Sequence, residues 1–324
     1  MNQIRDLQEL INTSISEINL NFKPTELYEP IIYSLSNGGK RLRPLLALVG
    51  CDLFNGKIED ALQLAIGMEI FHNFTLVHDD IMDNAPLRRG KETVYKKWDQ
   101  NIAILSGDTM FALAYHHICS TKPDVLPMIL EVFNQTAREV CEGQQYDMNF
   151  EGQKLISLKD YIEMIRLKTG VLLGCCLKAG ALCGGASAES AQYLYEFGVN
   201  LGISFQIKDD YLDIFGNEEA FGKLNCGDII ARKKTFLYLK ALEIAGIETR
   251  NEIIRVYNDL SISDNERVKL IKYYFIELGI KEVAELEMER FYSLGLEFLK
   301  KIEIPEEQFR LLLSISTSMM ERSH

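Results

Sequence analysis

Apolar residues recur along the chain at spacings of three and four, as in Leu194, Phe197, Leu201, Phe205 and Leu212. This spacing is typical of helices that bury one face, and no stretch shows the run of alternation that strands produce. Turn-forming residues interrupt the pattern only briefly, at residues 37–39, 84–86, 120–123, 184–185 and 216–227. Because these breaks are short, the pattern predicts an all-α fold, a single large helical bundle that occupies residues 1–324 as one domain.

Three helix starts can be predicted from local residue pairs. Ser157 with Asp160, and Ser263 with Glu266, have the spacing of a capping box, in which side chains satisfy the first backbone N–H groups of a helix. Pro305 suits a first-turn position, where its missing N–H group costs nothing.

Composition narrows the class of protein. The hydrophobic fraction of 47% is enough for a packed core, and the formal charge of −12 argues against a nucleic-acid partner, which would require a basic surface. The apolar stretch from Ala61 to Val77 carries polar residues and is shorter than a membrane span. The polar first ten residues lack the apolar core of a secretory signal, and seven cysteines without a C-x-x-C pair favour the reducing cytoplasm.

Two identical D-D-x-x-D clusters carry the candidate chemistry. The first is Asp79, Asp80 and Asp83, and the second is Asp209, Asp210 and Asp213. On a helix, residues four apart share a face, so each cluster places two carboxylates side by side, where they repel each other. An all-oxygen set with no histidine or cysteine partner at metal-binding spacing favours Mg²⁺, with Mn²⁺ as the alternative, and phosphate as the co-ligand. One such cluster could be a solvated helix end, but its duplication indicates a metal site.

Two small basic sets accompany these clusters. Gly38 and Gly39 precede the basic residues Lys40, Arg41 and Arg43 at an expected helix start, where free N–H groups favour anions. Arg88 and Arg89 follow the first Asp cluster within one loop. Either set alone could be a solvated surface, but with the carboxylates they outline a site for two phosphorylated ligands.

These motifs together resemble the trans-isoprenyl diphosphate synthases, also called polyprenyl synthetases, over most of the chain. The segment 39–44, G-K-R-L-R-P, is similar to the family's G-K-x-x-R-P motif. The resemblance implies a helical bundle of the isoprenoid synthase type with a central active-site cavity. It also implies that Lys40, Arg43, His72 and Arg89 bind isopentenyl diphosphate and that Arg88 binds the allylic diphosphate.

The second half of the chain resembles the family in the same order. Residues 143–147 are similar to its G-Q-x-x-D, Lys168 and Thr169 to its K-T pair, and Gln206 to the glutamine before the second metal motif. Lys223 resembles a phosphate-binding lysine in a mobile loop. Residues 228–235 resemble D-[IL]-x-x-G-K-x-T, with Arg232 where the family has glycine, so Lys233 is the implied phosphate ligand and Lys234 the alternative.

The implied reaction joins isopentenyl diphosphate to dimethylallyl, geranyl or farnesyl diphosphate. Metal bound by Asp79, Asp83 and Asp209, with Asp80, Asp210 and Asp213 in support, would neutralise the leaving diphosphate together with Arg88, Lys168 and Lys233. Oxygen atoms of Thr169, Lys168 and Gln206 would stabilise the allylic cation. A homodimer is expected from the resemblance alone.

Product length is predicted to depend on residues below the first Asp cluster. Phe71, Phe74 and Thr75 lie one and two turns before Asp79 and are expected to form the floor of the prenyl pocket. At positions 74 and 75 the sequence has an aromatic residue followed by a small one. In this respect it resembles the short-chain enzymes of the family that make geranylgeranyl diphosphate, with farnesyl diphosphate as the next candidate. Phe74 could also be an ordinary core residue.

Other protein classes fit less of the sequence. Class I terpene cyclases and head-to-head condensing enzymes also use Asp-rich helices, but cyclases usually lack a second D-D-x-x-D and the basic residues Lys40, Arg43 and Arg89. The pair His78 and Asp79 could belong to a metal phosphohydrolase, but the five histidines are poorly spaced for one. A non-catalytic regulatory subunit of a prenyl synthase would usually have lost one Asp cluster.

Overall fold

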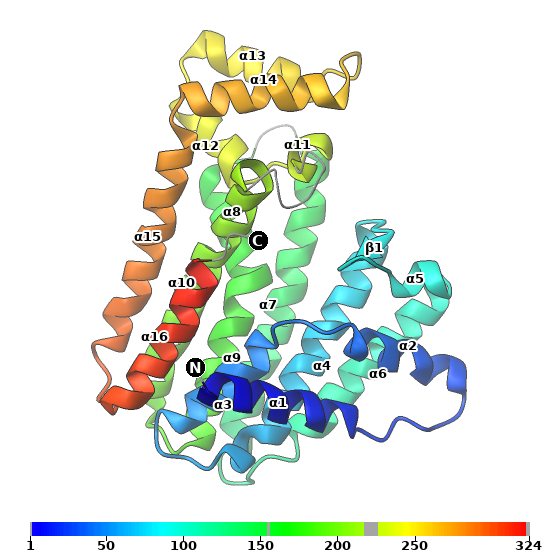
Figure 1. The fold of residues 1–324 in the computed structure, drawn as a ribbon, viewed down its shortest axis with the longest axis vertical. Coiled ribbons are helices and arrows are strands. Elements are labelled where there is room, and N and C mark those ends of the chain that lie inside the picture. The colour runs from blue at the N-terminus through cyan, green and yellow to red at the C-terminus, as the bar shows by residue number, and fades with distance from the viewer. Residues whose placement is uncertain (1, 154–155, 217–225, 322–324) are drawn as a thin grey trace. The chain divides into compact units, whose positions relative to one another are not determined.

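A computed structural model describes residues 2–153, 156–216 and 226–321. Within these ranges the elements are helices, apart from the two-residue strands β1 (Leu87–Arg88) and β2 (Lys91–Glu92), which pair antiparallel (Figure 1). The prediction of an all-α fold is therefore confirmed. No helix among the described residues is long and apolar enough to cross a membrane.

The chain divides into two compact units. Unit 1 comprises residues 1–135, 175–195 and 302–312, and unit 2 comprises residues 136–174, 196–301 and 313–324. Four helices contribute residues to both units: α7 (Leu126–Gly152), α9 (Val171–Cys183), α10 (Ala188–Phe215) and α16 (Glu306–Met320). The prediction of one domain over residues 1–324 stays a prediction.

Unit 1 is built around α4 (Ile58–Met82), which packs against α3 (Leu42–Asp52) and α6 (Gln100–Ile118). All eight residues from Leu64 to Phe71 are buried, as expected for a helix that is surrounded by others. A Cβ atom on Gly67 would lie 2.9 Å from the carbonyl oxygen of Ala114, so glycine permits the close approach of α4 and α6. The other described helices that lie wholly within this unit are α1 (Asn2–Ser16), α2 (Thr25–Ser36) and α5 (Val94–Lys97).

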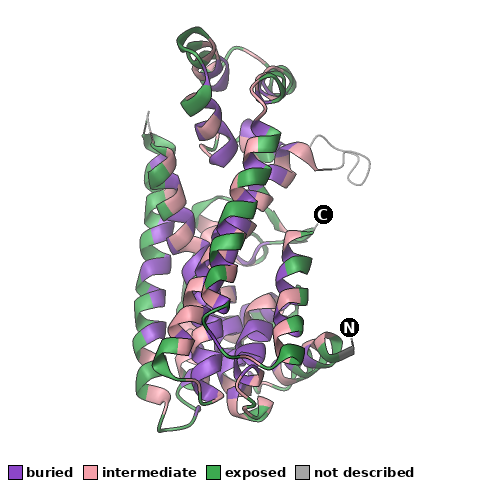
Figure 2. Cartoon of the chain, turned by 90° about the vertical axis from the view of Figure 1, so that its left-hand side faces the viewer, coloured by how far each residue is buried: buried purple, intermediate pink, exposed green. Residues whose placement is uncertain are grey.

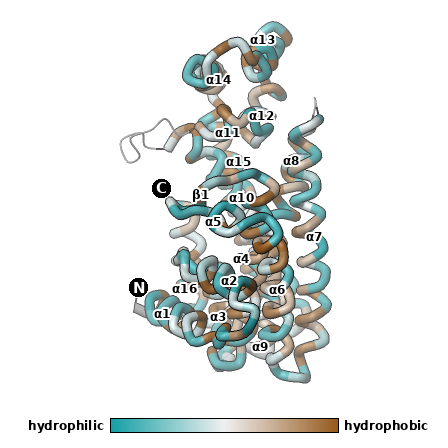
Figure 3. Tube along the Cα trace, turned by 90° about the vertical axis from the view of Figure 1, so that its right-hand side faces the viewer, coloured by the Kyte–Doolittle hydropathy of each residue, from teal (hydrophilic) through white to brown (hydrophobic). Residues whose placement is uncertain are grey.

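Unit 2 contains the second Asp cluster and the C-terminal helices. Its elements begin with α8 (Leu158–Ile165) and the π-helical turn η1 (Arg166–Gly170) and continue with α11 (Gly227–Ile230), α12 (Phe236–Ile244), α13 (Ile247–Asn258), α14 (Asp264–Glu277) and α15 (Ile280–Leu299). Buried and exposed residues alternate along the long helices (Figure 2), and hydrophobic and hydrophilic segments alternate along α7 (Figure 3). The 3.6-residue period seen in the sequence therefore marks the faces that are buried.

The predicted helix starts are confirmed. Ser157 Oγ accepts a hydrogen bond from the Asp160 N–H group at 3.1 Å, and the Asp160 carboxylate accepts one from the Ser157 N–H group at 3.2 Å, which completes the capping box of α8. Ser263 accepts from the Glu266 N–H group at 3.2 Å at the start of α14. Helix α16 begins directly after Pro305.

Candidate functional site

The first Asp cluster lies at the C-terminal end of α4. The Asp83 N–H group donates to the Asp79 carbonyl at 2.8 Å, so helical geometry continues to Asp83 and the two carboxylates share a face, as predicted. Asp80 is buried, and its Oδ1 accepts from Arg88 Nε at 2.8 Å. Burial raises the pKa of Asp80, and the charge of Arg88 opposes that rise. Asp80 therefore holds Arg88 in place, while Asp83 is exposed.

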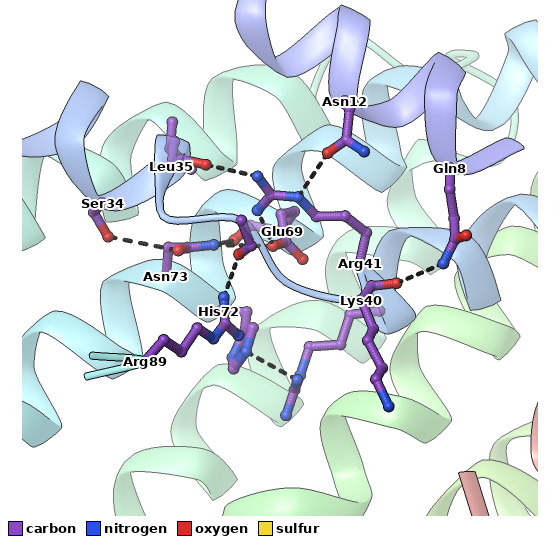
Figure 4. A network of polar contacts seen from close by, with 12 residues as sticks. Gln8, Asn12, Ser34, Leu35, Lys40, Arg41, Glu69, His72, Asn73 and Arg89 are labelled. Carbon is purple, nitrogen blue, oxygen red and sulfur yellow. Dashed lines mark hydrogen bonds and ion pairs between the residues drawn. The ribbon is translucent and has the colours of Figure 1, made fainter. Parts of the chain in front are cut away.

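The residues that were expected to bind isopentenyl diphosphate gather in unit 1 (Figure 4). Arg43 NH1 lies 2.9 Å from His72 Nε2, which links the start of α3 to α4. Arg89 donates to the Gly38 carbonyl. A Cβ atom on Gly39 would lie 2.5 Å from the Arg89 guanidinium, and the φ of 131° at Gly39 is itself a glycine conformation. Glycine at position 39 therefore lets Arg89 lie against the segment that carries Lys40.

The second Asp cluster lies near the end of α10, in unit 2. The carboxylate of Asp210 is buried and accepts hydrogen bonds from the Tyr161 hydroxyl, from the Phe236 N–H group at 3.1 Å and from Gln206 Nε2 at 3.3 Å. Asp213 accepts from the N–H groups of Gly227 at 3.0 Å and Asp228 at 2.9 Å. These two carboxylates join α10 to α8, α11 and α12, whereas the side chain of Asp209 is exposed.

Burial shifts the titration of three groups around Asp210. Desolvation raises the pKa of Asp210, and the charge of Asp228 raises it further. Desolvation also raises the pKa of Asp228, with the charge of Asp213 as the next cause. The pKa of Tyr161 rises for the same reason, with Asp210 as the second cause, so its hydroxyl keeps its proton and acts as a donor. Sequence reasoning missed Tyr161, because nothing in its local sequence points to a partner 49 residues away.

Lys168 and Thr169 lie on the π-helical turn η1 of unit 2. Lys168 Nζ donates to Asp147 Oδ2 at 2.6 Å, and the Thr169 hydroxyl donates to Gln206 Oε1 at 3.1 Å. A Cβ atom on Gly143 would lie 2.5 Å from the Lys168 backbone nitrogen. Glycine at position 143 therefore lets α7 approach η1 closely enough for Asp147 to reach Lys168. Single π-helical turns occur frequently at functional sites.

The segment 228–235 distinguishes the two candidate lysines. Lys234 Nζ donates to the carbonyls of Phe150 at 2.7 Å and Glu151 at 3.2 Å, in the last turn of α7, while the side chain of Lys233 is exposed. Arg232 has a φ of 55°, so it adopts the left-handed conformation for which the resembling family has glycine. The predicted ligand Lys223 lies outside the described residues.

A feature of this segment that sequence reasoning missed is its link to α13. The Tyr257 hydroxyl donates to the Lys233 carbonyl at 2.5 Å and lies 3.3 Å from the Asp228 carbonyl. The Tyr257 ring stacks on Tyr238 with 4.0 Å between centroids. One tyrosine therefore contacts both ends of the turn that precedes Lys233.

The aromatic residues below the first Asp cluster pack together in unit 1. The Phe74 ring centroid lies 5.6 Å from that of Phe71, 5.2 Å from that of Phe111 and 4.8 Å from that of His78. Thr75 instead donates from its hydroxyl to the His72 carbonyl at 2.8 Å. Phe111 was missed from the sequence, because it comes from α6 and no motif marks it.

The donor chemistry of both Asp clusters fits a hard divalent cation. In unit 1, Asp79 and Asp83 offer carboxylate oxygens from one face of α4, and in unit 2, Asp209 offers one from α10. Among the described residues, no three histidine, cysteine or acidic side chains lie close enough together to hold a metal ion. The metal ligands that were expected from the sequence therefore stay a prediction.

Comparison with known proteins adds a family and close relatives. The family model described as polyprenyl synthetase matches residues 24–274. The geranylgeranyl diphosphate synthase of Methanosarcina mazei is 37% identical over 245 residues, which cover 75% of this chain and 76% of that protein. The geranylgeranyl pyrophosphate synthase of Geoglobus acetivorans is 34% identical over 324 residues, which cover 99% of this chain and 98% of that protein.

A solved structure has the same fold over the whole length. The crystal structure of a geranylgeranyl pyrophosphate synthase superimposes with a TM-score of 0.93 at 40% identity, and the match covers 99% of each chain. The helices described above therefore belong to a fold that this enzyme shares.

Proposed function

Because the chain belongs to the polyprenyl synthetase family, we propose that it condenses isopentenyl diphosphate with an allylic diphosphate to make a short-chain all-trans prenyl diphosphate. The family and the isoprenoid synthase type of fold that were expected from the sequence are confirmed. Family membership makes the chain a prenyltransferase. The observation that carries the proposed reaction is that both D-D-x-x-D clusters are intact in a chain 34% identical to such an enzyme over 99% of its length.

Isopentenyl diphosphate is proposed to bind in unit 1. Lys40, Arg43 and Arg89 supply positive charge, and His72 supplies a further donor. Arginine forms paired hydrogen bonds to phosphate oxygens. These bonds orient the ligand, and the positive charge of the guanidinium offsets the negative charge of the phosphate. The link between Arg43 and His72 supports a common role for these two residues.

The allylic diphosphate is proposed to lose its diphosphate group first. When held by Asp79, Asp83 and Asp209, Mg²⁺ would supply the Lewis-acid charge that diphosphate needs in order to leave. Arg88, Lys168 and Lys233 would add positive charge at the leaving oxygens. The exposure of Lys233, together with the use of Lys234 on the last carbonyls of α7, supports Lys233 as the ligand of the pair.

The allylic cation then needs dipoles rather than a strong nucleophile. The Thr169 hydroxyl, the Lys168 carbonyl and the Gln206 amide oxygen are proposed to supply them. The hydrogen bond from Thr169 to Gln206 holds two of these groups together. The isopentenyl double bond attacks the cation, a carbon–carbon bond forms, and loss of one proton, for which the released diphosphate is the proposed acceptor, restores a double bond.

The product is proposed to be geranylgeranyl diphosphate, with farnesyl diphosphate as the next candidate. Phe74 lies within an aromatic cluster below Asp79, which supports its role in the floor of the prenyl pocket. The relatives named above carry geranylgeranyl diphosphate or pyrophosphate in their names. A homodimer, a cytoplasmic location and the choice of Mg²⁺ over Mn²⁺ stay predictions.

The experiment compares the wild type with Asp79→Ala and Asp209→Ala, using labelled isopentenyl diphosphate and each allylic starter with and without Mg²⁺. We expect kcat to fall at least about a hundredfold in both variants while the circular dichroism spectrum is kept, because each loses a carboxylate that holds the metal. Asp124→Ala is the matched control, because this exposed aspartate lies outside both clusters. Near-normal activity of both cluster variants would rule out the metal-binding role.

A further inference from the structure

The side chain of Arg41 points away from that of its neighbour Lys40 (Figure 4). Only 6% of Arg41 is exposed, and its guanidinium donates three hydrogen bonds. Nε donates to Asn12 Oδ1 at 3.1 Å, NH1 to Glu69 Oε1 at 2.6 Å and NH2 to the Leu35 carbonyl at 2.6 Å. The residue thereby joins α1, α2 and α4 to the start of α3.

The backbone of Arg41 adopts an unusual conformation. Its φ of 47° and ψ of 41° are left-handed, and Arg41 immediately precedes the first residue of α3. This conformation is unfavourable for a residue with a Cβ atom, so it persists only where surrounding contacts enforce it. The three hydrogen bonds provide that enforcement. The direction of the backbone at Lys40, just before α3, therefore depends on the side chain of Arg41.

Two residue pairs connect the start of α3 to α4. Arg41 and Arg43 are two residues apart on one segment, and Glu69 and His72 are one turn apart on α4. Arg41 pairs with Glu69 in the interior, and Arg43 pairs with His72 at 2.9 Å. Gln8 Nε2 adds a third restraint by donating to the Lys40 carbonyl at 3.0 Å. The buried bridge thus fixes the spacing at which the Arg43 bridge forms.

In the buried pair of Arg41 and Glu69, the Glu69 carboxylate also has a further hydrogen-bond partner. Glu69 Oε1 also accepts from Asn73 Nδ2 at 3.1 Å, and Asn73 Oδ1 lies 3.5 Å from the Ser34 hydroxyl. Buried ion pairs are expensive to desolvate, and well-packed apolar residues often give equal or greater stability. Stability alone therefore does not account for this pair. A role in fixing the geometry of the adjacent segment, which carries Lys40 and Arg43, would account for it.

We propose that Arg41, held by Glu69, is a positioning residue that presents Lys40, Arg43 and His72 to isopentenyl diphosphate in a fixed arrangement. This inference rests on the proposed function, because it assigns that ligand to these three residues. Arg41 itself lies behind the site and does not touch the ligand. Its loss is expected to weaken binding of isopentenyl diphosphate while leaving the allylic diphosphate, which Arg88 is proposed to bind, largely unaffected.

The test uses the full chain with Arg41→Met, Arg41→Lys and Glu69→Gln. Steady-state assays give kcat and the KM of each substrate, and calorimetry measures binding of isopentenyl diphosphate alone. Arg267→Met is the matched control, because Arg267 is also buried, at 1% exposed, and bonds Asp264 and the Asp259 carbonyl in unit 2. Thermal midpoints are measured for every variant.

We expect Arg41→Met to raise the KM and the dissociation constant of isopentenyl diphosphate at least about tenfold, since small displacements of positioning groups have large effects. The KM of the allylic substrate should stay within about twofold. Arg41→Lys should raise the KM of isopentenyl diphosphate less, because lysine keeps the positive charge but lacks the several donors of the guanidinium. If Arg41→Met does not fold, Arg41→Lys takes its place. Arg267→Met should lower the thermal midpoint without changing either KM.

Unchanged affinity of the Arg41 variants for isopentenyl diphosphate, beside an active wild type, would overturn this inference and leave the proposed function intact. Equal losses for both substrates, matched by Arg267→Met, would also overturn it, because they would show a general effect on stability. A folded wild type that neither binds nor condenses isopentenyl diphosphate would instead overturn the proposed function, and this inference with it.

Discussion

Arg43 NH1 lies 2.9 Å from His72 Nε2, although 29 residues separate the two in the sequence. Arginine can only donate, so Nε2 accepts and the imidazole is neutral, with its proton on Nδ1. Burial lowers the pKa of His72 well below its usual value of 6.5, and the charge of Arg43 is the second cause. His72 therefore has an N–H group to offer to a diphosphate, without a charge of its own.

The neutral state of His72 predicts how stability depends on pH. The unfolded chain protonates this histidine below pH 6.5 and the folded chain does not, so stability is lost as the pH falls through 6.5. Between pH 7 and pH 5 the wild type should lose about 1–2 kcal/mol more of its unfolding free energy than His72→Gln. Urea unfolding at each pH measures this difference. Identical slopes for wild type and His72→Gln would contradict the prediction.

Lys233 and Lys234 are neighbours with different expected roles. Lys233→Ala should lower kcat roughly tenfold or more with no loss of stability, because its exposed ammonium is proposed to bind diphosphate. Lys234→Ala should cost about 1 kcal/mol of stability, because it removes the bonds to Phe150 and Glu151. Turnover and urea midpoints of both variants check the assignment. The opposite pattern would transfer the phosphate-binding role to Lys234.

Arg232 occupies a left-handed backbone position, with a φ of 55°. Arg232→Gly should raise the unfolding free energy by about 1 kcal/mol, because glycine adopts this conformation without a Cβ clash. Arg232→Val should lower it by a similar amount or more, since β-branched residues tolerate positive φ poorly. Chemical unfolding of the two variants gives the signs directly. Destabilisation by glycine would show that contacts of the arginine side chain outweigh the backbone strain.

Product length should follow the side chains at positions 74 and 75. Phe74→Ala should lengthen the product, because it removes the ring that packs on Phe71 and Phe111. Thr75→Phe should shorten it by placing a second aromatic ring beside the first. Chromatography of the dephosphorylated products reads both changes. An unchanged product from both variants would remove these residues from the pocket floor.

The helices and the acidic clusters could be predicted because their determinants are local. A period of three to four residues, a capping box at Ser157 and carboxylates four apart at Asp79 and Asp83 depend on helix geometry alone. The glycines of the motifs could be recognised in the sequence, but the contacts that require glycine at these positions could not be predicted. Gly143 allows a backbone contact with Lys168, which only the folded chain defines.

The remaining parts of the site depend on contacts distant in sequence. Arg41 belongs to the same basic segment as Lys40 and Arg43. Composition does not reveal that Arg41 forms a buried ion pair with Glu69. The bonds from Tyr161 to Asp210 and from Tyr257 to Lys233 likewise cross 49 and 24 residues. Helix periodicity predicts which face is buried, but not which polar group lies opposite.

The measurement that tests the central claim most directly is the size of the product. Purified protein, Mg²⁺ and labelled isopentenyl diphosphate are incubated with dimethylallyl, geranyl or farnesyl diphosphate in turn, and the dephosphorylated products are sized. The account predicts linear prenyl alcohols that end at one length from every accepted starter, with geranylgeraniol as the expected end point. A folded protein that extends no starter, or that releases cyclic hydrocarbons, would contradict it.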